Sequence, residues 1–153
     1  QRVTTFGELP AGMWKWHGGV RGHDGAIYGI PSNADRVLKI KPNSDEVELI
    51  GDVLKGNCKW YGGLLGDDGA IYGMPFCAET VLRIDPGTGE VSTIGSLPQG
   101  EAKWHGGVVA GDGAIYGIPS HAEAVLKIVP RTGEVTTIGG PFLGEYKWGG
   151  GVL

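Results

Sequence analysis

A 44-residue unit occurs three times in this chain, in unbroken register. Its marker is a Lys-Trp pair, separated by one residue from Gly-Gly, at residues 15–16, 59–60, 103–104 and 147–148. Aligning residues 15–58, 59–102 and 103–146 leaves 21 of 44 positions identical in all three copies. A unit of this size cannot bury an apolar face alone, so a period of this length indicates a propeller or a solenoid.

Each copy contains four short apolar stretches separated by turn residues. In the first copy they cover residues 16–20, 26–30, 37–40 and 46–50. Asp24-Gly25 between the first two predicts a tight hairpin, because glycine supplies the positive φ that such turns need. No stretch has the 3.6-residue period of a helix. We therefore predict an all-β protein built from four-stranded antiparallel blades, and we favour a β-propeller over a solenoid.

The order of these residues resembles a known group of propellers. The segments Gly-Gly-Val, Asp-Gly-Ala-Ile-Tyr and Val-Leu-Lys-Ile-x-Pro-x-Thr-Gly-Glu-Val are similar to blades of the virginiamycin B lyase-like and gluconolactonase-like propellers. They are also similar to tandem propeller repeats in predicted microalgal proteins. The resemblance implies that the strand beginning at Trp16 is innermost and that the strand beginning at Glu46 is outermost.

The two ends of the chain match parts of the same repeat. Val3–Gly7 matches 135–139, an outermost strand, and Trp148–Leu153 matches an innermost strand. We therefore expect one propeller segment. It begins with the outer strand and loop of a preceding blade (1–14) and ends with the inner strand of a further blade (147–153). Between them lie three full blades, at residues 15–58, 59–102 and 103–146. Three blades are fewer than a closed propeller has, so we expect an incomplete ring. The chain opens at Gln1 without Met, so we expect a processed, excised or partly observed polypeptide. We favour a fragment of a longer propeller over a ring completed by other chains, because a dimer would still lack the middle strands of two blades.

The residues constant in every copy include aromatic and cationic side chains. The repeated tryptophans are expected to pack between blades, and the alternative is a ring that stacks on a ligand. They are Trp16, Trp60, Trp104 and Trp148. The lysines that precede them are expected to cover apolar surface with their stems while the ammonium reaches water.

The two cysteines lie at variable repeat positions. Folding the hairpin at residues 67–68 places Cys58 opposite Cys77, at a separation suited to a disulfide. Such a bond would favour an extracellular or organelle-lumen location. The alternative is a pair of reduced thiols.

The position after each Trp varies: His17, Tyr61, His105 and Gly149. In lyase-like relatives a His at this place points into the central tunnel and joins an active site with carboxylates and a divalent metal. This resemblance implies tunnel-lining positions for His17 and His105, but no acidic residue accompanies them on the inner strand. We predict no catalytic residue, metal site or cofactor, and lean away from an enzyme.

Variable loop residues offer a place for recognition. Our candidates for a ligand or partner face are Trp14, His17, Asn33, Tyr61, His105, His121 and Tyr146. We expect a non-catalytic binding or scaffolding module that contacts a protein partner or further copies of itself. A lectin-like, glycan-binding propeller is the first alternative, and a lyase- or lactonase-like enzyme with a tunnel metal is the second. The net charge of −4 argues against a nucleic-acid partner, and no apolar run reaches the length of a membrane span.

Overall fold

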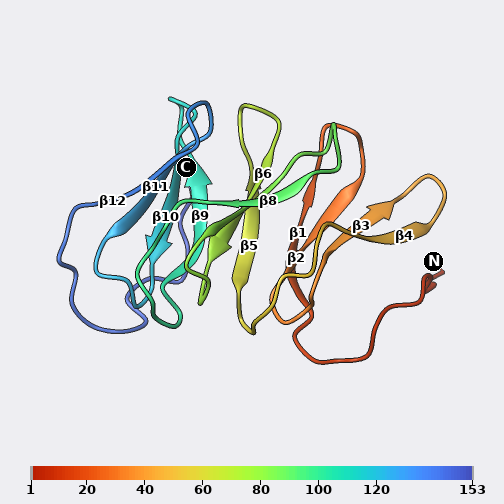
Figure 1. Ribbon diagram of the computed structural model, residues 1–153, viewed down its shortest axis with the longest axis horizontal. Helices are drawn as coiled ribbons and strands as arrows, with labels where there is room; N and C mark the ends of the chain where they lie inside the picture. Colours follow the sequence, from red (N-terminus) through yellow and green to blue (C-terminus); the bar gives the residue numbers. More distant parts are fainter. Residues whose placement is uncertain (1, 153) are drawn as a thin grey trace.

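The computed structural model describes residues 2–152, within which twelve β-strands form three sheets. The first sheet contains β1 (Trp16–Arg21), β2 (Ile27–Pro31), β3 (Val37–Lys41) and β4 (Glu46–Ile50). The second contains β5 (Trp60–Leu65), β6 (Ile71–Pro75), β7 (Val81–Ile84) and β8 (Val91–Ile94). The third contains β9 (Trp104–Val109), β10 (Ile115–Pro119), β11 (Val125–Val129) and β12 (Glu134–Ile138). Each sheet is antiparallel and pairs its strands in chain order (Figure 1).

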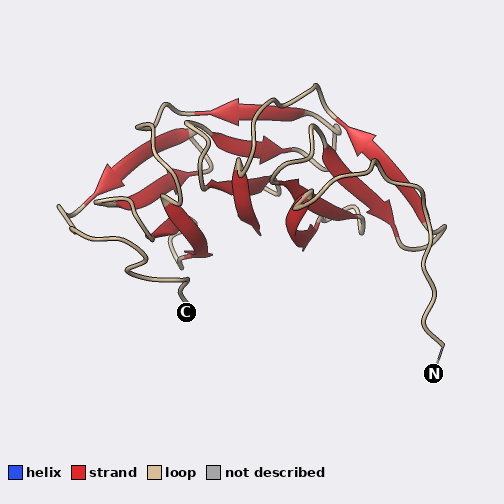
Figure 2. Cartoon of the chain, turned by 90° about the horizontal axis from the view of Figure 1, so that it is seen from below, coloured by secondary structure: helices blue, strands red, loops and turns tan. Residues whose placement is uncertain are grey.

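The sheets stand side by side as the blades of an incomplete propeller. Figure 2 shows them as an arch with the two termini at its open ends. β1 contacts β5, and β5 contacts β9. The predicted all-β, propeller-type fold is confirmed. No helix among residues 2–152 is long and apolar enough to cross a membrane.

The Asp-Gly hairpins have the predicted glycine geometry. In the first blade, Gly25 has φ of 81°, its N–H donates to the carbonyl of Gly22 at 3.0 Å, and Gly22 N–H donates to the carbonyl of Ala26 at 2.9 Å. The equivalent Gly69 and Gly113 of the other blades both have φ of 83°. The turn is therefore a three-residue hairpin loop that closes with a glycine in the left-handed region.

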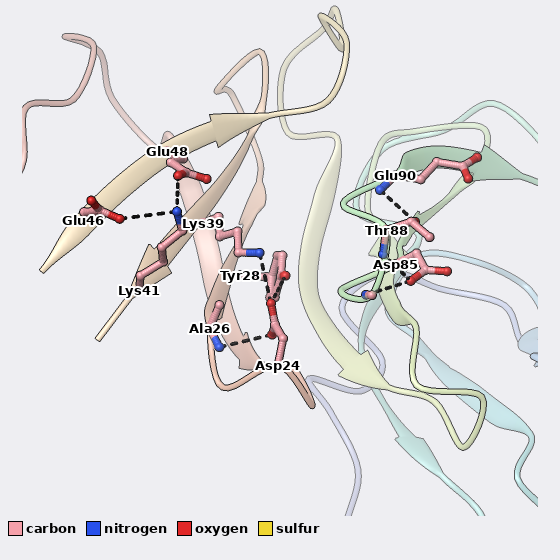
Figure 3. Close-up of polar contacts among 11 residues, drawn as sticks. Asp24, Ala26, Tyr28, Lys39, Lys41, Glu46, Glu48, Asp85, Thr88 and Glu90 are labelled. Carbon is pink, nitrogen blue, oxygen red and sulfur yellow. Dashed lines mark hydrogen bonds and ion pairs between the residues drawn. The ribbon is translucent and has the colours of Figure 1, made fainter. Parts of the chain in front are cut away.

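Asp24 links this turn to two strands (Figure 3). Its Oδ1 accepts the Ala26 N–H at 3.1 Å, and its Oδ2 accepts the Tyr28 hydroxyl at 2.8 Å. Lys39 of β3 lies 3.0 Å from the same Oδ2. Burial acts to raise the pKa of Asp24, but the hydrogen bonds from Lys39, Tyr28 and Ala26 outweigh it and lower the pKa below its usual range. The repeated Asp is thus explained by hairpin structure.

The hydrophobic core lies between blades. One cluster joins Tyr28, Ile30 and Val37 of the first blade to Trp60 and Ile71 of the second. The other cluster joins the second blade to the third in the same way and contains Trp104. Trp60 and Trp104 are 3% and 2% exposed, and their Nε1 atoms donate to the carbonyls of Thr80 and Ala124. Each blade therefore needs a neighbour to bury its apolar face.

The lysine before each internal Trp is buried, so the expectation that its ammonium reaches water was wrong. Lys59 is 4% exposed, and its Nζ donates to the carbonyls of Ser32, Ala34 and Gly56 at 2.9, 2.8 and 2.8 Å. Ser32 and Ala34 belong to the preceding blade. Burial lowers the pKa of Lys59. We call this arrangement the lysine latch, because one ammonium ties two blades together through backbone carbonyls.

The second internal interface has the same latch. Lys103 is also 4% exposed, and its Nζ donates to the carbonyls of Cys77, Ala78 and Gly100 at 3.1, 2.9 and 3.1 Å. Backbone carbonyls present the same shape whatever the side chain, so the latch tolerates the variable residues around it.

The flanking segments occupy blade-like positions without forming strands. Gly7 lies against Val47 of β4, as Gly51 and Gly95 lie against the equivalent valines, Val91 and Val135, of the next blades. At the other end, Lys147 N–H donates to the carbonyl of Ser120 at 3.2 Å, matching the internal bond from Lys59 to Ser32. Among residues 2–15 and 139–152 no strand is formed, because no middle strands of those blades are present to pair with them. Leu153, the last residue of the predicted inner strand, lies outside the described residues.

Candidate functional site

Aromatic and imidazole side chains converge on the concave side of the arch. The register between β5 and β6 shifts between the pairs Trp60–Pro75 and Gly63–Gly73, and the other two blades have the same shift. This irregularity is a β-bulge, which re-aims the side chain that it carries. In each blade the bulge spans the position after the Trp, where His17, Tyr61 and His105 stand. The repeated bulge therefore turns these three side chains toward one another.

These side chains stack into a layer that we call the inner wall: His17, Tyr61, Phe76 and His105. The His17 ring stacks on Tyr61 with centroids 3.3 Å apart and planes 15° apart. Tyr61 lies 4.6 Å from Phe76 and 4.9 Å from His105. Three sequence candidates are thus brought together, with Phe76 added to them. Phe76 was missed because the equivalent positions of the other blades are Ser32 and Ser120, and only that break in the repeat could have signalled it.

The two imidazoles of the inner wall differ in their surroundings. His105 Nδ1 lies 2.8 Å from the carbonyl of Gly149, so this nitrogen carries the proton and donates it. His17 Nδ1 is buried without a hydrogen-bond partner. Burial, and then the proximity of His105, lower the pKa of His17. Both effects favour a neutral His17 ring in the stack.

A pocket opens where the inner wall meets the C-terminal segment. Its volume is about 320 Å³, and its lining includes Tyr61, Phe76, His105, Tyr146 and Trp148. Tyr146 and Trp148 are 75% and 48% exposed. A pocket lined by flat aromatic faces can hold a small planar or apolar group, or the apolar face of a sugar ring.

The remaining candidates lie along one loop face. We call this row the loop band: Trp14, Asn33, Cys58, Cys77, Ala102, His121 and Tyr146. The same backbone bond joins six of them in three pairs: Asn33 N–H to the Trp14 carbonyl, Cys77 N–H to that of Cys58 and His121 N–H to that of Ala102, at 3.0, 3.0 and 2.9 Å. The hairpin turns at the far ends of β1 and β2, β5 and β6, and β9 and β10 lie on the opposite face (Figure 1).

Contacts between blades make the loop band continuous. Asn33 Oδ1 accepts the Cys58 N–H at 2.8 Å and so links the first pair to the second. The His121 and Tyr146 rings meet edge to face with centroids 4.3 Å apart. The loop band therefore runs from one edge of the arch to the other.

Four members of the loop band share an unusual backbone conformation. Trp14, Cys58, Ala102 and Tyr146 have φ of 52°, 50°, 48° and 47°, in the left-handed region, although none is glycine. This conformation costs a residue with a side chain on the order of 1 kcal/mol. The repeat thus imposes one strained backbone conformation on four residues whose side chains differ.

The predicted disulfide between Cys58 and Cys77 was wrong, because both cysteines are free thiols. The predicted pairing holds for the backbone, as the bond from Cys77 to Cys58 shows. However, Cys58 is exposed and left-handed, whereas Cys77 is half-buried. The two residues therefore lack the regular antiparallel geometry on which the prediction depended. Burial raises the pKa of the Cys77 thiol.

Metal-binding groups do not gather among the described residues. Within residues 2–152 no group of three or more His, Cys, Asp or Glu side chains is placed to hold a metal ion. The imidazoles of the inner wall contact rings and a backbone carbonyl. The chemistry that this arrangement offers is stacking and hydrogen bonding.

A family model matches residues 18–151, which is most of the chain. The chain belongs to DUF6923, a family described as a repeat of unknown function. No curated protein matches the sequence.

Solved structures share the fold at low sequence identity. Virginiamycin B lyase from Staphylococcus aureus, in a catalytically inactive form with quinupristin, is similar with a TM-score of 0.70 and 19% identity, over 87% of this chain and 44% of that one. A streptogramin B lyase structure gives a TM-score of 0.71 and 23% identity, over 87% and 43%. An extracellular domain from B. thetaiotaomicron, assigned to a hybrid two component system, has a TM-score of 0.66 and 18% identity. That match covers 86% of this chain and 17% of the other. The chain spans less than half the length of any of the three.

Proposed function

We propose that this DUF6923 chain is a non-catalytic binding and scaffolding module whose loop band docks a partner protein. The propeller blades supply the rigid support, and the seven residues of the loop band supply the contact surface. Binding surfaces are commonly built from variable residues on a constant frame.

One observation carries this proposal: the same backbone bond recurs in each blade while the side chains that it positions differ. The pairs Trp14–Asn33, Cys58–Cys77 and Ala102–His121 share hydrogen bonds of 3.0, 3.0 and 2.9 Å. Trp14 and Tyr146 add large exposed aromatic side chains, 69% and 75% exposed. Aromatic residues of this kind are enriched at protein interfaces.

A second candidate is glycan binding at the pocket beside Tyr146 and Trp148. The exposed rings favour it, since sugar rings stack on aromatic faces. The internal tryptophans do not add to it, because Trp60 and Trp104 are buried and their Nε1 atoms are engaged by carbonyls. A glycan site would therefore occur once per chain and would not repeat with the blades.

An enzyme like the lyases is the least supported candidate. Such chemistry needs groups in different roles, an acid and a base. The imidazoles of His17 and His105 have no carboxylate beside them in the inner wall, and His17 stacks on Tyr61.

Photo-crosslinking tests the docking face. A photoactivatable amino acid replaces His121 or Tyr146 in the loop band, and His23 in the opposite hairpin serves as the matched control. In cells that produce the chain, we expect the same protein to be captured from both band positions and not from His23. Tyr146→Ala should then weaken binding of that purified protein by about tenfold or more. Equal capture from His23, or none from the loop band, would contradict the proposal, and binding of a glycan with one site per chain would favour the second candidate.

A further inference from the structure

Another cavity lies beside the loop band, between the loop that precedes β9 and the loop that joins β10 to β11. Its volume is about 410 Å³. The residues that line it include Pro98, Ala122 and Ala124, which are apolar. Two carboxylate residues, Glu101 and Glu123, line it as well. This combination suits a ligand group that has an apolar stem and a cationic head.

The carboxylates of this cavity have no cation beside them. Glu101 and Glu123 are exposed, and neither forms an ion pair within residues 2–152. Lys103 also lines the cavity, but its ammonium donates to three backbone carbonyls. Glu79 and Glu145, elsewhere on the same loop face, are exposed and form no ion pair in that range either. This part of the loop face therefore complements a cation that another molecule brings.

His121 adds a hydrogen-bonding atom to the same cavity. It is a member of the loop band and lines the cavity, and its Nε2 is buried without a hydrogen-bond partner in the described part of the chain. A buried polar atom costs free energy unless a hydrogen bond satisfies it. With the ring proton on Nδ1, this nitrogen can accept an N–H from a group bound in the cavity.

The first blade has the equivalent cavity with different charges. Its volume is about 650 Å³, and the repeat positions that line the cavity of the third blade line this one as well. Met13 stands at the position of Glu101, and Arg36 adds a cation to the lining. The carboxylate of this cavity, Asp35, lies 3.7 Å from the Lys55 ammonium. The repeat therefore builds the cavity, and the excess of negative charge is a property of the third blade.

The carboxylates stay accessible when a blade has neighbours on both sides. Blade 2 lies between blades 1 and 3. Its residues at the positions of Glu101 and Glu123 are Asn57 and Glu79, and both are exposed. A further blade beside the third would thus leave this cavity open, so its accessibility does not depend on the length of the array.

We infer that this cavity binds an arginine side chain of the partner protein that docks on the loop band. The methylene stem packs on the apolar part of the lining, and the guanidinium bonds the carboxylates of Glu101 and Glu123. One N–H donates to Nε2 of His121. Arginine suits the site better than lysine, because its planar group carries several donors and can serve several acceptors at once. The inference rests on the proposed docking role of the loop band and adds the chemistry of the partner.

A capped pentapeptide with a central arginine tests the site on the purified chain. The same peptide with citrulline is the matched ligand, because citrulline keeps the shape of arginine and removes its charge. In heteronuclear NMR spectra the arginine peptide should shift the amide signals of Glu101, His121 and Ala122. The citrulline peptide should bind about tenfold more weakly or worse.

Charge substitutions in the chain give the second measurement. Glu101→Gln and Glu123→Gln should each weaken binding of the arginine peptide by about threefold or more. Both keep the backbone contacts of the loops, including the bond from the Phe142 N–H to the carbonyl of residue 123. Glu90→Gln is the matched control, since Glu90 is exposed after the turn between β7 and β8 and the change in charge is the same. It should leave binding unchanged.

The outcomes separate this inference from the proposed function. No capture of a protein from His121 or Tyr146 contradicts the docking role of the loop band, and the peptides still test the cavity. A captured protein whose binding is unchanged by Glu101→Gln and Glu123→Gln overturns the arginine site alone. Equal binding of the two peptides overturns it too, as does a loss with Glu90→Gln equal to that with Glu123→Gln. So does the absence of any shift at these amides with about 10 mM arginine peptide.

Discussion

Replacing Lys59 by Met tests the lysine latch that joins the first two blades. The change keeps a long unbranched side chain and removes three hydrogen bonds of 2.9, 2.8 and 2.8 Å to Ser32, Ala34 and Gly56. The Ser32 carbonyl retains the Lys59 N–H as a donor. The carbonyls of Ala34 and Gly56 lose their side-chain donor.

The magnitude follows from those two carbonyls. A fully buried carbonyl left without a partner costs about 1–3 kcal/mol, and these two bonds are part-buried, so each loss lies toward the lower end of that range. Relief from burying an ammonium offsets part of this. We expect Lys59→Met to lower the free energy of unfolding by about 1–2 kcal/mol, which for a chain of this length lowers the midpoint temperature by about 2–8 °C.

Urea and thermal unfolding followed by circular dichroism measure this loss. Lys55→Met is the matched control, because the Lys55 side chain is 81% exposed and its carboxylate neighbour, Asp35, lies 3.7 Å away. We expect that control to change stability by less than about 0.5 kcal/mol. Equal effects of the two substitutions would refute the latch, since they would mean that three hydrogen bonds of a buried ammonium contribute no more than one exposed ion pair.

Three further predictions concern glycine, histidine and tyrosine. Gly51→Ala should destabilise the chain by about 2 kcal/mol or more, because its Cβ would lie 2.7 Å from Val91 Cβ of the next blade and φ is 81°. Gly25→Ala is the control, with the same φ of 81° and open space around it, and should cost about 1 kcal/mol in the same unfolding assay. The free energy of unfolding should fall as the pH drops below 6.5. Burial and His105 lower the pKa of His17 from 6.5, so the unfolded state binds more protons than the folded state in that window. His17→Gln should reduce this pH dependence, and an unchanged stability profile in the variant would contradict the prediction. In an ultraviolet titration Tyr72 should ionise with a pKa of about 12, after an exposed tyrosine, because burial and its bond to a carboxylate hold the proton; loss of that late transition in the Tyr72→Phe variant would assign it.

The repeat made most of the fold predictable. The period of 44 residues, the four apolar stretches and the Asp-Gly turns placed four strands in each copy. The positive φ of Gly25 follows from turn chemistry alone. Turn chemistry and apolar patterning were enough to predict the strands, because each turn and each strand shows the same pattern in all three copies.

The surroundings of single side chains were less predictable. Lys59 and Lys103 are buried because carbonyls from two blades converge on their ammonium groups, and no local pattern announces such a convergence. The disulfide prediction used strand pairing, but Cys58 lies in the left-handed region, outside a regular ladder. Phe76 follows β6 and meets the inner wall at Tyr61, the side chain that the bulge in β5 re-aims.

The identical blade interfaces have a consequence for how such a gene can change. Because Lys59 and Lys103 bond backbone carbonyls, insertion or loss of a whole 44-residue unit leaves the lysine latch at each remaining interface chemically the same. Unequal recombination can therefore lengthen or shorten the array without new compensating substitutions. Descendants of one gene could then differ in the number of repeats while sharing the same lysine latch between blades.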